Sequence, residues 1–454
     1  MKKAIAPILM FATVLLASLL CMRYTFVCQE YEGLFLNTPD WWARAWAQQL
    51  PVSGIISDFL TQFYRDPLYG AIITAVLITG VFLLLRGILC RFGLSGNAIA
   101  AFASGALWVF VAHSSTSKPA VFVLLLMAAA WLLSLLFKIK QLRKERKADL
   151  PLSSVMLVAA AACVVLSPAV MRAENFNRVK VDALYGIWDD LLATVPPEEA
   201  EKNAELTPFA LLALSGKGEL GDKMFTYPVF EQNDLDMEAY DGKGEYYTSL
   251  LFKACLYQYL GCYNEAIHNY FQWSTQLRQG TSFVVLRRLA ELYCLQGNYD
   301  LMEKYCRILD KSLLNGAYVR HFRAMATKGT AQQPTSVQDR AAMPVISHDP
   351  LYNLVLLQSS GFDTRMSADR MLCTLILKKD FIRFGSIMEV LAPAYEHIPL
   401  HFQEVMVFAG LRSFDVDAAV VERYSAFVSD MMDMPQERLF QLYKGSAFPF
   451  LFSE

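Results

Sequence analysis

Hydrophobic positions follow two different patterns along the chain. In the first 170 residues they form nearly uninterrupted runs, whereas further on they recur with helical spacing between polar positions. A bilayer core of about 30 Å needs ~20 apolar residues in a helix, so the runs predict membrane-spanning helices. We predict five spans, near residues 5–22, 68–89, 96–111, 119–137 and 152–170.

The positions of lysine and arginine predict how these spans are oriented. The segment just after the fourth span carries six basic residues within ten positions: Lys138, Lys140, Arg143, Lys144, Arg146 and Lys147. Because cytoplasmic loops are enriched in such residues, this segment is expected in the cytoplasm. Counting spans outward places the N-terminus in the cytoplasm and everything after residue 170 on the opposite side.

The loop between the first two spans, residues 23–67, has apolar residues with helical period. Trp42, Trp46 and Leu50 share one face, and a second apolar face runs from Ile55 to Phe63 after a break at Pro51. Two short amphipathic helices lying at the membrane interface are therefore expected, a depth that tryptophan favours.

Four acidic residues on this loop suggest a catalytic alternative. They are Glu30, Glu32, Asp40 and Asp58. In this position they resemble the acidic loops of polytopic enzymes that act on lipid-linked sugars. The same residues are also explained as the polar face of interfacial helices, so both interpretations remain open.

Charge separates the two halves of the chain. Residues 171–454 hold 27 of the 41 Lys and Arg residues and 36 of the 43 Asp and Glu residues, a net charge near −9. Hydrophobic residues nevertheless make up 55% of the whole chain, and the mean hydropathy is +0.30. An acidic half beyond the membrane does not favour nucleic acid as a partner.

The acidic half contains an internal repeat. Two segments align with a spacing of 36 residues between Gly261 and Gly297. The residues that define the repeat are Ala254, Tyr257, Gly261, Tyr263 and Ala266 in the first copy, and Ala290, Tyr293, Gly297 and Tyr299 in the second. Each glycine allows the left-handed conformation that ends a helix, and each alanine lets two helices approach closely.

This repeat resembles the tetratricopeptide (TPR) repeat, whose unit is a pair of antiparallel helices. The spacing differs from the usual 34 residues, and Met302 replaces a small residue in the second copy. The resemblance implies an α-solenoid, a fold that typically binds peptides or protein partners along a concave face. Tyr246 is the best candidate for such a contact.

The chain is thus predicted to be all-α, with a bundle of about five transmembrane helices followed by a TPR-like solenoid. We expect a membrane domain over residues 1–170 and helical repeats over 171–326. A flexible linker over 327–350 and further repeat-like helices over 351–454 complete the domain organisation.

Sequence motifs for catalysis are mostly missing. The chain has no HExxH, Walker A, CxxC or GxSxG motif, its six histidines are scattered, and its nine cysteines have irregular spacing. No metal site or cofactor is therefore predicted, and an enzyme is the less favoured class. Small core thiols explain the cysteines of the acidic half, with a disulfide bridge there as an alternative.

The whole chain is similar to an uncharacterised family of Bacteroidetes envelope proteins, through the segments 219–225 (ELGDKMF) and 399–404 (PLHFQE). Together with the orientation predicted from lysine and arginine, this resemblance implies a multi-pass protein of the bacterial inner membrane with a periplasmic C-terminal domain. The expected function is a scaffold that binds protein partners in the cell envelope; the alternative is a degenerate enzyme acting on lipid-linked sugars. The sequence does not predict an oligomeric state.

Overall fold

The computed structural model describes residues 2–47, 51–92, 94, 96–135, 149–237, 243–331, 352, 355 and 365–453. Within these ranges every regular element is an α-helix or a 3-10 helix, which confirms the predicted all-α class. The chain forms two compact units. The bundle unit comprises Met1–Val181, Leu277–Cys294 and Asn298–Ala331, and the helical unit comprises Asp182–Gln276, Leu295–Gly297 and Gln332–Glu454.

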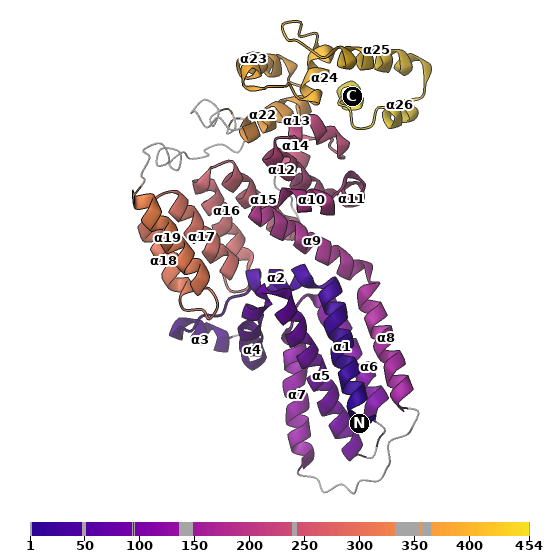
Figure 1. Cartoon of the computed structure of the whole chain (residues 1–454), viewed down its shortest axis with the longest axis vertical. Coiled ribbons are helices and arrows are strands. Elements are labelled where there is room, and N and C mark those ends of the chain that lie inside the picture. Colours follow the sequence, from indigo (N-terminus) through magenta and orange to yellow (C-terminus); the bar gives the residue numbers. More distant parts are fainter. Residues whose placement is uncertain are drawn as a thin grey trace. The chain divides into compact units, whose positions relative to one another are not determined.

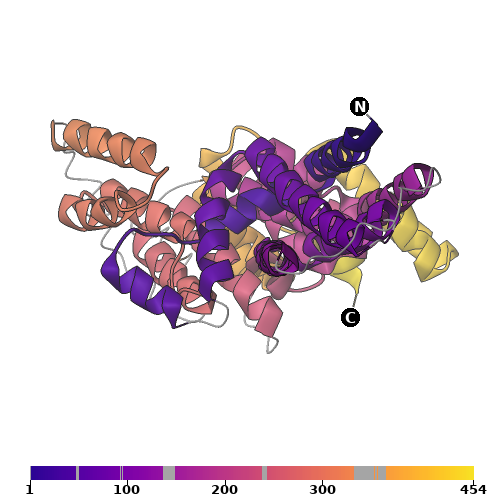
Figure 2. The same ribbon diagram turned by 90° about the horizontal axis from the view of Figure 1, so that it is seen from below.

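Five apolar helices lie side by side in the bundle unit (Figures 1 and 2). They are α1 (Lys2–Cys21), α5 (Pro67–Arg91), α6 (Gly96–Ser114), α7 (Lys118–Leu135) and α8 (Asp149–Val165). Three of them, α5, α6 and α7, are long and apolar enough to cross a membrane by themselves. Two further helix pairs are bent: α1 with α2 (Arg23–Glu32) by 79°, and α8 with α9 (Pro168–Tyr185) by 48°. If each bent pair counts as one span, the number of candidate spans rises to five.

Contacts at the helix ends show in which direction each helix runs. At the end of α6, His113 Nε2 lies 2.9 Å from Ser167 Oγ, which follows α8. At the start of α5, a Cβ added to Gly70 would lie 2.6 Å from the Phe26 ring in α2. Helices α6 and α8 therefore run in the same direction, whereas α1, which leads into α2, runs opposite to α5.

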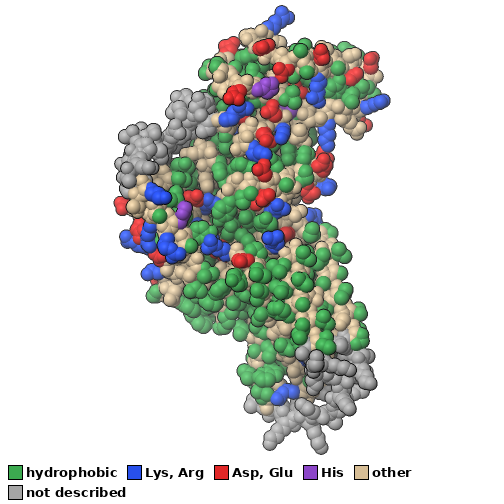
Figure 3. Space-filling model, viewed as in Figure 1, with side chains coloured by type: hydrophobic (Ala, Val, Ile, Leu, Met, Phe, Trp, Pro, Cys, Tyr) green, Lys and Arg blue, Asp and Glu red, His purple; other side chains and the backbone are tan. Residues whose placement is uncertain are grey.

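Small residues fill the interior of the bundle, and large apolar residues cover its surface. Ala71, Ala75 and Ala100 are fully buried, as expected where helices associate by close packing in lipid. In Figure 3 apolar side chains form a nearly continuous surface over the bundle. The exposed apolar residues of the bundle helices include Val76, Leu83, Phe102, Phe110, Leu126, Leu132, Leu133 and Val158.

The loop before α5 folds into α2, α3 (Pro39–Trp46), α4 (Pro51–Thr61) and η1 (Gln62–Arg65). The two amphipathic helices predicted around Pro51 are thus confirmed as α3 and α4, whereas α2 was not predicted. Helix α4 turns its polar side inward, burying Ser57 and Asp58, while Val52 and Phe59 are exposed. This orientation is unfavourable in water and suits a helix whose outer face meets apolar lipid.

The two aligned repeat segments form two helix pairs. The first, α15 (Lys243–Tyr259) and α16 (Tyr263–Gln276), belongs to the helical unit, and the second, α17 (Phe283–Leu295) and α18 (Tyr299–Leu309), belongs to the bundle unit apart from residues 295–297. Gly261 and Gly297 have φ of +79° and +74°, the left-handed conformation that the sequence predicts. Helix α19 (Gly316–Ala331) follows in the bundle unit.

The helical unit contains the remaining described helices of eight or more residues: α12 (Thr207–Lys217), α22 (Arg365–Leu377), α23 (Phe381–Leu391), α24 (Leu400–Ala409) and α25 (Ala418–Asp433). Shorter elements connect them, namely α10 (Trp188–Thr194), α11 (Pro197–Lys202), α13 (Leu220–Lys223), α14 (Gln232–Asp236), α26 (Gln436–Leu442) and α27 (Phe448–Phe452). Of the predicted linker 327–350, residues 332–350 lie outside the described ranges.

Candidate functional site

A buried ion pair joins α2 to α17 within the bundle unit. Arg287 donates from Nη1 to Glu30 Oε2 at 3.1 Å and from Nη2 to Glu30 Oε1. The Glu30 side chain is 2% exposed and that of Arg287 is 4% exposed. The Nε of Arg287 donates to Asn315 Oδ1 at 2.7 Å, and its guanidinium lies 4.5 Å from the Tyr318 ring centre. This paired geometry satisfies both buried charges.

A second carboxylate, Asp58 of α4, binds the turn that precedes α17. Arg278 Nη2 donates to its Oδ1, and Gln279 Nε2 donates to its Oδ2 at 2.8 Å. The Gln279 side-chain oxygen in turn accepts from Trp41 Nε1 at 3.0 Å, and the same indole N–H also donates to Leu34 O at 3.2 Å. The amide of Gln279 therefore links α3 to α4.

Backbone hydrogen bonds complete this junction, which we define as the contacts of residues 30–62 with residues 278–318. Phe283 N donates to Gly33 O at 3.0 Å, and Asn37 N donates to Lys311 O at 3.0 Å. Further along, Leu313 N donates to the side-chain oxygen of Gln62 at 3.2 Å. The second repeat segment is thus fixed to the loop that follows α1.

The structure separates the four acidic residues of the catalytic alternative. Glu30 and Asp58 are held by Arg287 and Arg278, as described, and Glu32 lies 3.8 Å from Lys180 Nζ of α9. Asp40 is exposed in the first turn of α3.

Several residues of the junction were not predicted from the sequence. Arg287 was missed, although a basic residue within the apolar run Phe283–Leu295 is a signal that a partner is needed. Trp41, which is 2% exposed, was also not predicted. Helical spacing indicates Trp42 and Trp46 instead, and these lie on the more exposed side of α3. For Arg278 and Gln279 no local sequence signal exists.

A pocket of about 110 Å³ opens at the junction. It is lined by Trp41, Arg44 and Ala45 from α3, and by Arg278 and Gln279 from the turn before α17. Lys118, at the start of α7, is close enough to Arg278 and Asp58 to interact with both charges. The pocket combines an indole wall with an excess of positive charge.

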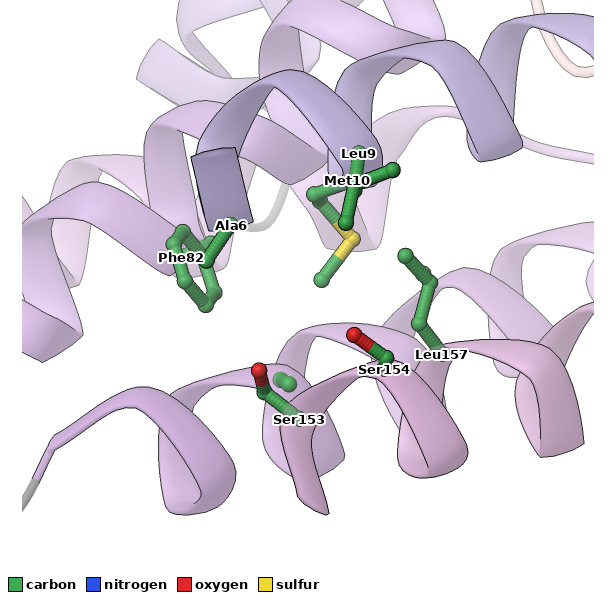
Figure 4. A pocket seen from close by; sticks show the side chains of 8 residues that line it. Ala6, Leu9, Met10, Phe82, Ser153, Ser154 and Leu157 are labelled. Carbon is green, nitrogen blue, oxygen red and sulfur yellow. The ribbon is translucent and has the colours of Figure 1, made fainter. Parts of the chain in front are cut away.

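Two other pockets have neither arginine nor tryptophan in their lining. One lies among α1, α5, α6 and α8, has a volume of about 10 Å³, and is lined mainly by apolar side chains and by Ser153 and Ser154 (Figure 4). That volume suits a single water molecule. The other, about 200 Å³, lies in the helical unit between Glu205, Asn233, Asp234 and Thr248.

The helical unit has buried polar networks of its own. Arg370 is 1% exposed and donates to Asp236 Oδ1 at 2.9 Å and to Ser215 Oγ at 3.1 Å. His401 and Glu404 form a fully buried pair, with 2.9 Å between Nδ1 and Oε2. Each group in these networks has a protein partner.

The two segments that carried the envelope-family resemblance contact each other here. Leu400 N donates to Asp222 Oδ1 at 2.7 Å, and Phe225 N donates to His401 Nε2 at 3.3 Å. A Cβ added to Gly221 would lie 2.7 Å from Pro399 Cβ, so only glycine fits. Both segments are therefore explained by packing.

The structure describes residues that define the repeat. In the repeat, Ala254, Ala266 and Ala290 are fully buried. Tyr293 stacks on Tyr305 with 5.6 Å between ring centres, which pairs α17 with α18. Tyr246 falls in α15, but its side chain lies outside the described residues.

All nine cysteines are free thiols, and eight of them are wholly or partly buried. Within the described ranges no group of three or more His, Cys, Asp or Glu side chains is arranged to hold a metal ion.

These features define an all-helical protein with apolar helices that suit a membrane and a repeat segment fixed to the loop beside them. The chain belongs to a family of unknown function, DUF6057, whose model matches residues 1–180 and 172–448. No curated protein and no solved structure matches it.

Proposed function

We propose that the protein is a membrane-anchored scaffold whose TPR-like helical region binds protein partners in the cell envelope. The observation that carries this proposal is the use of Glu30 and Asp58 as ion-pair partners of Arg287 and Arg278. Acidic residues in such ion pairs hold the second repeat segment against the loop that follows α1. A catalytic acid or base must instead be able to reach a substrate. A repeat segment that is held in place beside the membrane helices and is exposed suits a scaffold.

The same ion pairs support the proposed topology. Because Glu30 contacts Arg287, both must lie on one side of the membrane, and the chain between them must cross it an even number of times. Helices α5, α6 and α7 account for three crossings, so α8 supplies the fourth. With α1 this gives five spans, an N-terminus in the cytoplasm and a periplasmic helical region, in agreement with the positive-inside rule.

Single cysteines introduced into a cysteine-free variant test this topology in intact cells. Leu313→Cys, at a side chain that is 60% exposed, is expected to react with a membrane-impermeant maleimide. Arg143→Cys, in the basic segment, is expected to react only after the cells are opened. Reaction of both positions in intact cells would contradict five spans.

The scaffold itself is tested with the full chain in crosslinked membranes. On α23, Ile382 is 85% exposed and Val390 is 76% exposed, and a spacing of eight places them on one side of the helix. Partners recovered with the wild-type protein should be lost from the double variant Ile382→Asp/Val390→Asp. They should be kept by Ser425→Asp, which adds a charge at an exposed polar position of α25.

Recovery of no protein partner by the wild-type chain would refute the scaffold. The enzyme alternative is then tested at Asp40, the acidic residue that lies exposed on α3. Substituting all four acids together would instead break the junction. Loss of the cellular phenotype in Asp40→Asn, at normal expression, would favour the enzyme.

A further inference from the structure

The pocket at the junction has the charge of an anion-binding site. Arg44 and Arg278 line it, and Lys118 lies within electrostatic reach of Arg278. The acidic residues nearby are Asp58, which binds Arg278, and Asp40, one turn before Arg44 on α3. Two arginines line the pocket, and of these only Arg278 is paired with a carboxylate of the described residues, so the positive charge of Arg44 favours a negatively charged ligand.

The pocket walls are held in place by their own hydrogen bonds. Trp41 is fixed by the bonds from its indole N–H to Leu34 O and Gln279 Oε1, and Gln279 is fixed in turn by Asp58. Arg44 Nε lies 3.4 Å from Asp40 O, a long contact that a ligand can replace at little cost. The site is therefore formed before a ligand arrives, which lowers the entropic cost of binding.

The surroundings of the pocket place it at the depth of lipid headgroups. Trp46 of α3 is 57% exposed, and Val52 and Phe59 of α4 are 47% and 39% exposed. Exposed tryptophan and phenylalanine beside the ends of membrane helices are typical of the interface between water and hydrocarbon. Helix α4 is joined to the start of α7 through Ser57 and Ser117, whose Oγ atoms lie 2.9 Å apart.

We propose that this pocket binds a phosphate group, with Arg44 and Arg278 as its ligands and Trp41 as its apolar wall. Guanidinium groups match the geometry of phosphate oxygens. A volume of about 110 Å³ leaves room for a phosphate group. The phosphate comes from a membrane phospholipid or from a free phosphate compound.

The test uses the full-length protein in a maltoside detergent, which contains no phosphate, with tryptophan fluorescence as the readout. The probes are inorganic phosphate, short-chain phosphatidylglycerol and the matching short-chain diacylglycerol. Binding of both phosphate compounds assigns the site to phosphate in general, and binding of phosphatidylglycerol alone assigns it to lipid. Either result supports the proposal, whereas equal binding of diacylglycerol overturns it.

Variants connect the signal to this pocket. Arg44→Gln is expected to weaken binding at least tenfold, and Arg44→Lys is expected to lie between it and the wild type. Arg307→Gln, at an exposed arginine of α18, should bind like the wild type. Wild-type affinity in Arg44→Gln overturns the proposal. None of these outcomes depends on protein partners, so the scaffold and the phosphate site can fail separately.

Discussion

The Glu30–Arg287 pair gives the sharpest test of the junction. Arg287→Met keeps the length of the side chain but leaves a carboxylate that is 2% exposed without its partner. Loss of one member of a buried pair costs about 3–5 kcal/mol, because the remaining charge stays desolvated. Glu30→Gln should cost less than Arg287→Met, since Arg287 keeps Asn315 and the Tyr318 ring. The double variant Glu30→Gln/Arg287→Met should lose about 2–3 kcal/mol less unfolding free energy than the sum of the losses in the two single variants.

The assay is equilibrium unfolding of the full-length protein in detergent, followed by tryptophan fluorescence, to which three of the seven tryptophans contribute from α3. Arg307→Met is the matched control, because its side chain is 75% exposed and makes an i,i+4 pair with Glu303 at 3.3 Å. That variant should lose less than about 1 kcal/mol. If the double variant costs the full sum of the single ones, or if Arg287→Met behaves like the control, the buried pair does not hold the junction.

Three further predictions follow from local features. Gly261→Ala should lower stability by about 1 kcal/mol in thermal unfolding, since a Cβ there meets nothing within 4 Å and only the strain of φ +79° contributes. Burial raises the pKa of Glu404, but hydrogen bonds from His401 and Ala447 N outweigh it and hold the pKa below the ordinary 4.5. Its contribution to stability is therefore complete above pH 4.5 and lost as the pH falls through the lowered pKa, and Glu404→Gln should remove this dependence from melting curves. Burial raises the pKa of the Cys262 thiol to about 12, so iodoacetamide at pH 8 should modify it, by mass spectrometry, only after denaturation.

Features set by local sequence were predicted well. The first four hydrophobic runs match α1, α5, α6 and α7, whereas the fifth covers α8 and the start of α9 beyond a bend of 48°; Pro51 begins the second amphipathic helix. The glycines at 261 and 297 end helices in the left-handed conformation as the repeat requires. In each case the information lies within a few residues of the feature, either as apolar length or as a backbone preference.

Features set by distant contacts were not predicted. Helix α2 has a mixed composition, and its direction follows from the 79° bend after α1 and from Glu174, whose carboxylate accepts from the first backbone N–H groups of α2. The acids Glu30 and Asp58 look the same in the sequence whether they serve a substrate or an arginine. Only the fold reveals their partners.

The separation of Glu30 from Arg287 by 257 positions bears on how a cell makes this protein. At a synthesis rate of ~5–20 residues per second, α2 emerges roughly 13–51 seconds before its partner is translated. Throughout that interval Glu30, which is buried in the folded protein, has no counter-ion from α17. A chain that is truncated before α17 keeps its apolar helices but leaves Glu30 without its counter-ion. The late arginine therefore marks a chain that has been synthesised at least as far as α17.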